Sequence, residues 1–288
     1  MSLIVSVRCT LLCGLFCGAL LPSAHAAEDA ALRFSLAPGL TATARPEPSG
    51  AIAVLLPSGR QQRLAGVTDA DGRMRLSAED IDFDGHPELV ARAAVGQVNE
   101  AVAVYRYDRA QARFVALEPA THPHSQCGGL MGLSVDTPNR TLSSSCRSGP
   151  MWYVDFYRFA GPQLYLYRAE RMLMVDDALE VVVLVKQSAD SGPLAVWSTY
   201  DPAGKVIETA IADGLDAPRS SAGLQAVSGQ VVPERLPLHA RPGDASTRRY
   251  LLRDDRVELL DEADGWLQVR YDNPKRGAVL GWIRVSAP

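Results

Sequence analysis

The chain has 288 residues, of which 47% are hydrophobic and 22% are charged, and its formal net charge is −4. This composition is typical of a globular protein with a buried core, and it argues against a mainly disordered chain. The net negative charge argues against nucleic acid as a partner, because a phosphate backbone requires an excess of basic residues.

The N-terminal segment has the parts of a secretory signal peptide. Arg8 supplies the basic start, Thr10–Leu21 is almost wholly apolar, and Ala24–Ala26 is a small-residue cleavage signal. We therefore expect cleavage after Ala26 and a periplasmic mature protein. The apolar run is too short to span a bilayer as a helix, and no later segment qualifies, so the sequence predicts no transmembrane segment.

A lipoprotein anchor is the less favoured alternative for this segment. Cys13 and Cys17 lie in the apolar run and could carry a lipid. Leu12 and Phe16 precede them, at the position where a lipobox has a small residue. We therefore expect the cleaved, unanchored form.

The mature chain is a series of short apolar and β-branched runs separated by turn sequences. For example, Val102–Tyr107 and Arg113–Leu117 flank the turn residues Asp108–Ala110. Apolar and polar residues alternate from Tyr153 to Phe159, and only Ala169–Ala178 could hold even a short helix. The sequence therefore predicts an all-β protein, a meander of hairpins that closes as a barrel, a sandwich or a small propeller.

Composition divides the mature chain into two predicted domains. Residues 215–229 are rich in Ala, Ser, Gly and Pro and have few large apolar residues, which is typical of a linker. We expect a first domain over residues 27–214 and a small separate barrel over residues 230–288.

The most specific motif is an acidic loop that follows the first group of predicted strands. Its carboxylates alternate along the chain, Gly85 permits a sharp turn, and the oxygen donors suit Ca²⁺. The predicted ligands are the side chains of Asp80, Asp82 and Asp84, the backbone carbonyl of His86, and Glu88 directly or through water.

This loop is not an EF-hand. The twelfth position counted from Asp80 is Ala91 and not the bidentate Glu of that motif, and no flanking helices are predicted. We expect a calcium loop between strands with a structural role, because no nucleophile or second metal site accompanies it. The alternative is an acidic turn without a metal, in which Asp and Gly serve turn geometry.

Signal cleavage leaves two cysteines, Cys127 and Cys146. An even pair in an exported protein predicts one disulfide, worth about 3 kcal/mol for a loop of this length. A zinc site with His122 and His124 is the alternative, but the spacings match no common zinc pattern. We favour the disulfide because of the compartment.

The stretch from Asp80 to Arg168 resembles a family of periplasmic calcium-binding proteins. The markers are DIDFDGHPEL, then YRYDRAQARFVAL, then LSVDTPNRTLSSSCRSGPMWYVDFYRFAGPQLYLYRAE. The family consists of lysozyme-inhibitor-like immunity proteins, which protect against lysozyme-like toxins delivered by bacterial killing type IV secretion systems. The resemblance implies a small β-propeller-like fold similar to invertebrate-type lysozyme inhibitors.

In those relatives, a loop with Ser-Gly and a nearby tyrosine plugs the enzyme's active cleft. The matching residues are Ser148 and Gly149, with Tyr153 four positions after the glycine. Arg147 and Trp152 add a cation and a large aromatic, which are typical of interface hot spots. Arg147 could pair with the carboxylates of a glycosidase. The alternative is that Trp152 and Tyr153 are strand residues, of which one faces the core.

The C-terminal sixty residues look like a bacterial SH3 domain. The segments that carry this resemblance are Leu238–Gly243, Val257–Leu260, Gly265–Tyr271 and Gly281–Ile283. It implies attachment to cell-wall peptide or to a protein. Trp266 and Tyr271 are the expected groove residues, whereas Trp282 is expected to fill the core.

The sequence contains none of the common catalytic motifs: no H-E-x-x-H, no G-x-S-x-G, no P-loop and no glycine-rich dinucleotide fingerprint. We therefore expect a non-enzymatic periplasmic inhibitor that binds and occludes the cleft of a peptidoglycan hydrolase. The alternative is a cell-wall or envelope binding module that acts through the SH3-like domain without inhibition.

Overall fold

The computed structural model describes residues 31–173, 178–187, 190–219 and 221–285. The predicted signal peptide and its cleavage site therefore lie outside the described residues. The described residues contain 21 strands in antiparallel sheets, so the all-β prediction is confirmed. None of these sheets closes into a barrel.

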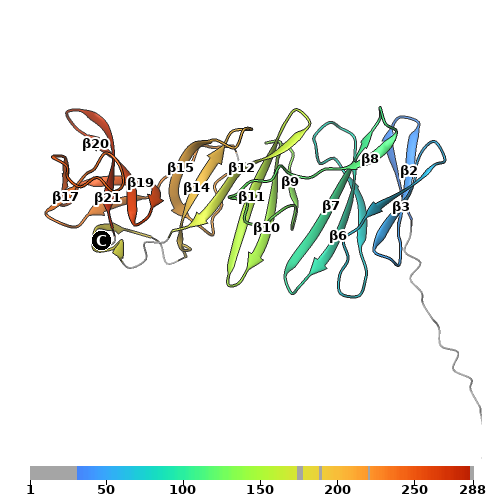
Figure 1. Ribbon diagram of the computed structural model, residues 1–288, viewed down its shortest axis with the longest axis horizontal. Helices are drawn as coiled ribbons and strands as arrows, with labels where there is room; N and C mark the ends of the chain where they lie inside the picture. Colours follow the sequence, from blue (N-terminus) through green and yellow to red (C-terminus); the bar gives the residue numbers. More distant parts are fainter. Residues whose placement is uncertain (1–30, 174–177, 188–189, 220, 286–288) are drawn as a thin grey trace, which may run out of the picture. The chain divides into compact units, whose positions relative to one another are not determined.

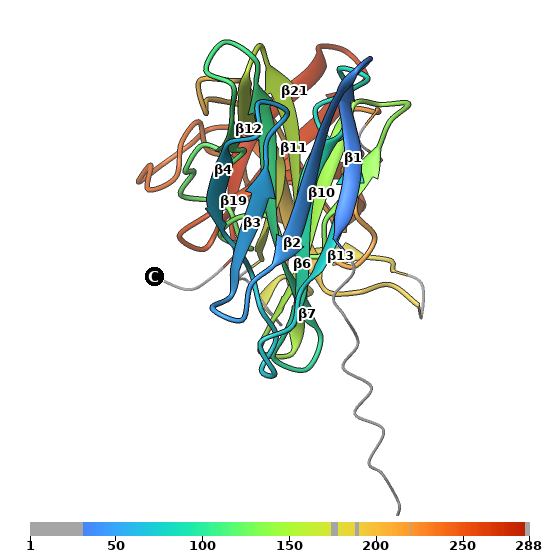
Figure 2. The same cartoon turned by 90° about the vertical axis from the view of Figure 1, so that its right-hand side faces the viewer.

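The first two sheets are four-stranded meanders, in which each strand pairs with the next along the chain. The strands of the N-terminal sheet are β1 (Leu32–Ala37), β2 (Leu40–Pro46), β3 (Ala51–Leu55) and β4 (Gln61–Ala65). The strands of the second sheet are β5 (Arg75–Glu79), β6 (Glu88–Val95), β7 (Asn99–Asp108) and β8 (Arg113–Ala116). Figure 2 shows the strands of the N-terminal sheet, in blue, at the front. Short turns suffice for these sheets because antiparallel neighbours need no long crossover.

The third sheet has six strands in the order β15-β14-β12-β11-β10-β9. Its strands are β9 (Ser134–Asp136), β10 (Thr141–Ser148), β11 (Met151–Ala160), β12 (Gln163–Met172), β14 (Leu194–Tyr200) and β15 (Val206–Asp213). The helix considered for residues 169–178 does not form over its first four residues, which belong to β12, and residues 174–177 lie outside the described part.

The C-terminal part has a five-stranded sheet and a two-stranded sheet. The larger sheet contains β13 (Val183–Val185), β16 (Ser228–Val231), β19 (Arg256–Ala263), β20 (Trp266–Asn273) and β21 (Gly277–Arg284), and the smaller contains β17 (Arg235–Pro237) and β18 (Tyr250–Leu252). No described helix has the length and hydropathy to cross a bilayer.

Three hydrophobic clusters lie between successive sheets. The colours in Figure 1 follow the sequence and so show the order of the sheets. The N-terminal and second sheets share a cluster in which the rings of Phe34 and Phe114 lie 6.0 Å apart. The second and third sheets share a cluster that includes Val104 and Tyr157. The third and C-terminal sheets meet in the largest cluster. Each sheet is therefore stabilised by apolar burial against its neighbour in sequence.

The segment predicted as a linker, residues 215–229, is hydrogen-bonded to the sheets on both sides. The Val227 amide donates to the Ile211 carbonyl of β15, and the Leu259 amide of β19 donates to the Val227 carbonyl, at 2.8 and 3.1 Å. Strand β13, which falls in the range predicted for the first domain, pairs with β16 of the C-terminal sheet. Backbone hydrogen bonds thus cross both predicted domain boundaries.

A buried arginine fixes the same segment on the third sheet. Arg168 of β12 is fully buried, and its guanidinium donates to the carbonyls of Arg219 and Ala222 at 2.9 and 3.0 Å. Its Nε donates to Thr199 Oγ1 at 3.0 Å, and Glu208 lies 3.7 Å from Nη2. A buried cation needs such partners, so this segment and Arg168 depend on each other.

Candidate functional site

The acidic loop lies between β5 and β6 and brings three carboxylates together. Oxygens of Asp80, Asp82 and Glu88 lie within 4.8 Å of one another, and the last two residues are buried. No other group of three or more acidic, histidine or cysteine ligands is found in the described part of the chain. These three residues could hold a metal ion.

Local backbone geometry explains how the loop converges. Phe83 and Gly85 have left-handed φ angles of 62° and 84°, which turn the chain sharply twice. The Asp80 carboxylate accepts hydrogen bonds from the amides of Asp84 and Gly85 at 3.2 and 3.1 Å. The loop therefore folds around the first carboxylate of the motif, as an Asx-type turn does.

The innermost ligand candidate is Glu88, at the start of β6. Its Oε2 accepts the amides of Ile81 and Asp82 at 2.8 and 3.2 Å. Burial raises the pKa of Glu88 to about 7, and the nearby carboxylates of Asp82 and Asp84 contribute to the rise. A bound cation would relieve both the burial of charge and the repulsion.

Burial also raises the pKa of Asp82, helped by repulsion from Asp84, whereas Arg106 acts in the opposite direction. Arg106 Nη1 lies 3.3 Å from Asp82 Oδ2 and compensates part of the charge. Asp84, the third carboxylate of the motif, is not in the group of three. Its Oδ1 accepts the His86 amide at 2.7 Å. The ligand roles of Asp84 and of the His86 carbonyl thus remain predictions.

The acidic loop also contacts the third sheet. Arg140, in the turn between β9 and β10, donates from Nη1 to the Phe83 carbonyl at 3.1 Å, and its guanidinium lies 5.4 Å from the centre of that ring. The Phe83 ring meets Phe159 of β11 edge-on at 6.3 Å. The loop therefore joins the second and third sheets, so a metal bound there would stiffen their junction.

The second candidate region is the tip of the β10–β11 hairpin, residues Arg147–Tyr153. Arg147 pairs with Trp152 across the strands, and Ser148 pairs with Met151. Gly149 has a φ of 60° and makes the turn. Arg147, Ser148 and Gly149 are exposed, Trp152 is 44% exposed, and Tyr153 is half-buried. The Arg147–Trp152 pair thus lies on the surface.

The hairpin tip is held from two sides. Cys146, which pairs with Tyr153, forms a disulfide with Cys127 (S–S 2.06 Å), so the disulfide prediction is confirmed. Asn99 of β7 accepts the Arg147 amide at 2.8 Å and donates to the Arg147 carbonyl at 3.1 Å. The tip is therefore pre-organised before any partner binds.

The zinc alternative is excluded by the disulfide, because both sulfurs are bonded to each other. The His122 ring packs against the ring of Tyr200, with centroids 4.4 Å apart, and His124 stacks on the same tyrosine at 5.9 Å. The two histidines serve packing in this region.

The residues expected in an SH3 groove have mixed environments. Trp266 is only 8% exposed and packs edge-on against His239 at 5.0 Å, so its ring lies in the interior and not in a surface groove. Tyr271 is half-buried and donates its hydroxyl to Asp255 at 3.1 Å. The Trp282 ring, which was expected to fill the core, is also half-buried.

Sequence reasoning missed two residues that position the candidate sites, Asn99 and Arg140. Asn99 lies 48 positions from its partner and Arg140 lies 57 positions from Phe83. Neither contact has a local sequence signal.

Comparison with known proteins found no matching family model, and no curated protein or solved structure shows significant similarity to the chain.

Proposed function

We propose that this protein is a periplasmic inhibitor that inserts the β10–β11 tip into the active cleft of a lysozyme-like peptidoglycan hydrolase, with a structural Ca²⁺ ion at Asp80, Asp82 and Glu88. The observation that carries the proposal is the exposed Arg147–Trp152 pair on a tip held by a disulfide and by Asn99. Tryptophan and arginine are enriched in interface hot spots, which makes this pair the candidate anchor for a partner.

Charge supports an acidic partner site. Arg147 takes part in none of the ion pairs between described residues, and its Nε donates only to the Gly149 carbonyl at 3.1 Å. A glycosidase carries two carboxylates in its cleft, which a guanidinium can bind in bidentate geometry. The positive charge of Arg147 on the tip is therefore complementary to the negative charge of such a cleft.

The test is inhibition of muramidase activity by the purified protein. The enzymes are hen egg-white, goose-type and invertebrate-type lysozymes and any wall hydrolase encoded beside its gene. We expect inhibition of at least one, and we expect Arg147→Ala and Trp152→Ala each to weaken it by about 2 kcal/mol, roughly 30-fold. Arg45→Ala, a change of an exposed arginine in the N-terminal sheet, is the control and should have no effect.

Inhibition that is absent against every enzyme, or that survives both tip substitutions, would refute the inhibitor proposal. Wall binding through the C-terminal part, the alternative function, has no comparable support because Trp266 is buried. Co-sedimentation with purified peptidoglycan tests it directly.

The metal is tested by calorimetric titration with Ca²⁺ and Mg²⁺. We expect one Ca²⁺ per chain and weaker Mg²⁺ binding, because clustered carboxylates with a flexible ligand shell suit the larger ion. Asp82→Asn should abolish the heat signal. Asp71→Asn, in the exposed turn before β5, removes the same charge outside the cluster and should leave binding unchanged.

A further inference from the structure

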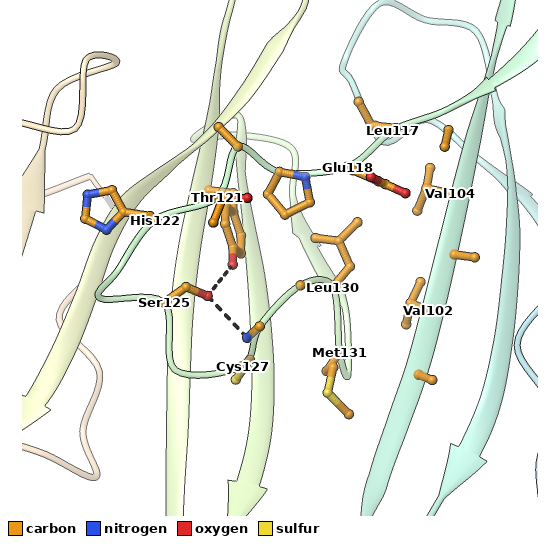
Figure 3. A pocket seen from close by; sticks show the side chains of 18 of the residues that line it. Val102, Val104, Leu117, Glu118, Thr121, His122, Ser125, Cys127, Leu130 and Met131 are labelled. Carbon is orange, nitrogen blue, oxygen red and sulfur yellow. Dashed lines mark hydrogen bonds between the residues drawn. The ribbon is translucent and has the colours of Figure 1, made fainter.

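A cavity of about 480 Å³ lies beneath the loop that connects the second and third sheets (Figure 3). The loop begins after β8, where the Leu117 amide donates to the Val104 carbonyl of β7 at 2.8 Å. It returns where the Val102 amide donates to the Leu130 carbonyl at 3.2 Å. Residues 118–129 therefore bulge between two neighbouring anchor points on one strand and cover the space between the sheets.

The cavity is preformed. The Ala120 amide donates to the Leu164 carbonyl of β12 at 2.8 Å, and the disulfide fixes Cys127 at the other end of the loop. Its volume is within the range of small-molecule sites, about 300–1,000 Å³. A ligand would therefore find a formed site and would not have to order the loop first.

The cavity walls are mixed, with slightly more apolar than polar surface. Figure 3 labels the aliphatic side chains that line it. They are Val102, Val104, Leu117 and Leu130. This apolar part of the wall would favour the hydrocarbon part of a ligand.

Two of the hydroxyl groups at the cavity, those of Ser125 and Tyr157, direct their protons away from a ligand. The buried Asp155 carboxylate accepts Ser125 Oγ at 2.8 Å and the amides of Gln126 and Cys127 at 3.1 and 2.9 Å. The Tyr157 hydroxyl lies 3.2 Å from Ser125 Oγ and 3.4 Å from Asp155 Oδ2. Ser125 Oγ also accepts the Gly128 amide at 3.3 Å. Both hydroxyl protons are thus directed at Asp155 or at each other, which leaves a lone pair of the Tyr157 oxygen for a ligand.

The charge of the cavity is negative. Glu118 is exposed, takes part in none of the ion pairs between described residues, and is the only acidic lining residue, while no lysine or arginine is among the described residues that line the cavity. The His122 ring is engaged elsewhere, because it packs against Tyr200 and its Nδ1 accepts the His124 amide at 3.3 Å. The polar side chains facing a ligand are therefore the Tyr157 oxygen as an acceptor, the Thr121 hydroxyl, which can donate or accept, and the Glu118 carboxylate.

We propose that this cavity binds a small organic cation, an ammonium group on an apolar body, with the ammonium paired to Glu118 and the body packed on Val102, Val104, Leu117 and Leu130. A carboxylate or phosphate ligand would face Glu118 with no cation to compensate, and it could not donate to the Tyr157 oxygen. This proposal does not depend on the inhibitor function, since the cavity and the hairpin tip use different residues.

The test is calorimetric titration of the purified protein with three probes of equal chain length: n-hexylammonium, 1-hexanol and hexanoate. We expect n-hexylammonium to bind most tightly, 1-hexanol more weakly, and hexanoate not at all. Glu118→Gln should weaken n-hexylammonium binding about fivefold, the effect of losing a partly exposed ion pair, and leave 1-hexanol binding unchanged. Glu180→Gln, which removes the same charge at an exposed position outside the cavity, should alter neither.

Two substitutions that fill the cavity complete the test. Val102→Phe should abolish binding of n-hexylammonium and 1-hexanol, and Ala116→Phe, at an exposed lining position that tolerates a larger side chain, should do so without affecting folding. The proposal is overturned if no probe binds at millimolar concentration, if hexanoate binds as well as n-hexylammonium, if Glu118→Gln has no effect, or if the folded Ala116→Phe protein still binds.

Discussion

Glu170 of β12 should make the stability of the protein depend on pH. The residue is 5% exposed, and its Oε1 has no hydrogen-bond partner among the described residues. Burial raises the pKa of Glu170 to about 7, with smaller contributions from the charges of Asp155 and Asp213, while a hydrogen bond from the Val154 amide opposes the rise. The folded protein therefore binds this proton more tightly than the unfolded chain, where the pKa is 4.5.

Proton linkage gives the direction in which stability changes with pH. Below pH 4.5 the carboxyl is protonated in both states, and its contribution to stability is greatest. As pH rises through the folded pKa, the folded protein must either keep a proton that the unfolded chain has lost or bury a charge, so stability falls until about pH 7 is passed. A rise from 4.5 to about 7 corresponds to at most about 3 kcal/mol, at 1.36 kcal/mol per pKa unit.

Glu170→Gln removes this titration and retains an oxygen that can accept the Val154 amide. We expect the free energy of unfolding of the variant, relative to wild type, to rise by up to about 3 kcal/mol between pH 4 and pH 8. Urea denaturation at pH 4, 6 and 8 measures it, with Glu180→Gln as the exposed control. A difference that is the same at all three pH values would show that the pKa of Glu170 is the same in the folded protein and in the unfolded chain, and it would refute the reasoning.

Three further variants test the contacts that stabilise the fold and the hairpin tip. Replacing Cys127 and Cys146 by alanine opens a loop with a sequence separation of 19, and urea denaturation should show a loss of about 3 kcal/mol. Arg168→Met removes the charged donor from the carbonyls of Arg219 and Ala222; we expect a loss of about 3 kcal/mol and faster proteolysis of the segment between β15 and β16. Asn99→Ala should speed amide exchange of Arg147, measured by NMR, without changing the exchange of distant strands.

Local patterns in the sequence predict the strands and the acidic loop well. Alternation of apolar and polar residues predicts β11, because a strand with one buried face imposes a period of two. Gly85 and the alternating carboxylates predict a sharp acidic turn, because glycine adopts the left-handed conformation easily. The cysteine pair predicts the disulfide because the predicted compartment favours oxidised cysteines. All of these signals lie within a few residues or rest on residue type alone.

Features that depend on distant residues could not be predicted. The composition of residues 215–229 suggests a linker, but Arg168 lies about fifty positions away, and its need for buried partners holds the segment on the third sheet. Trp266 is buried because His239 and the strand pairing place its ring inward, and a period-two pattern cannot choose between the two faces of a strand. The absence of barrel closure likewise depends on the relation between sheets and not on any one of them.

The meander order of the first two sheets has a consequence for how the chain folds. Every strand of these sheets finds its partner in the strand immediately before or after it, so each hairpin closes through a short loop at low entropic cost. Such sheets can assemble one after another, from the amino end onward, as a chain emerges. In the later sheets some strands pair with partners that are not next in sequence. Among the described strands β13 and β16 have the greatest separation, more than forty residues, so their pairing is the step we expect to complete last.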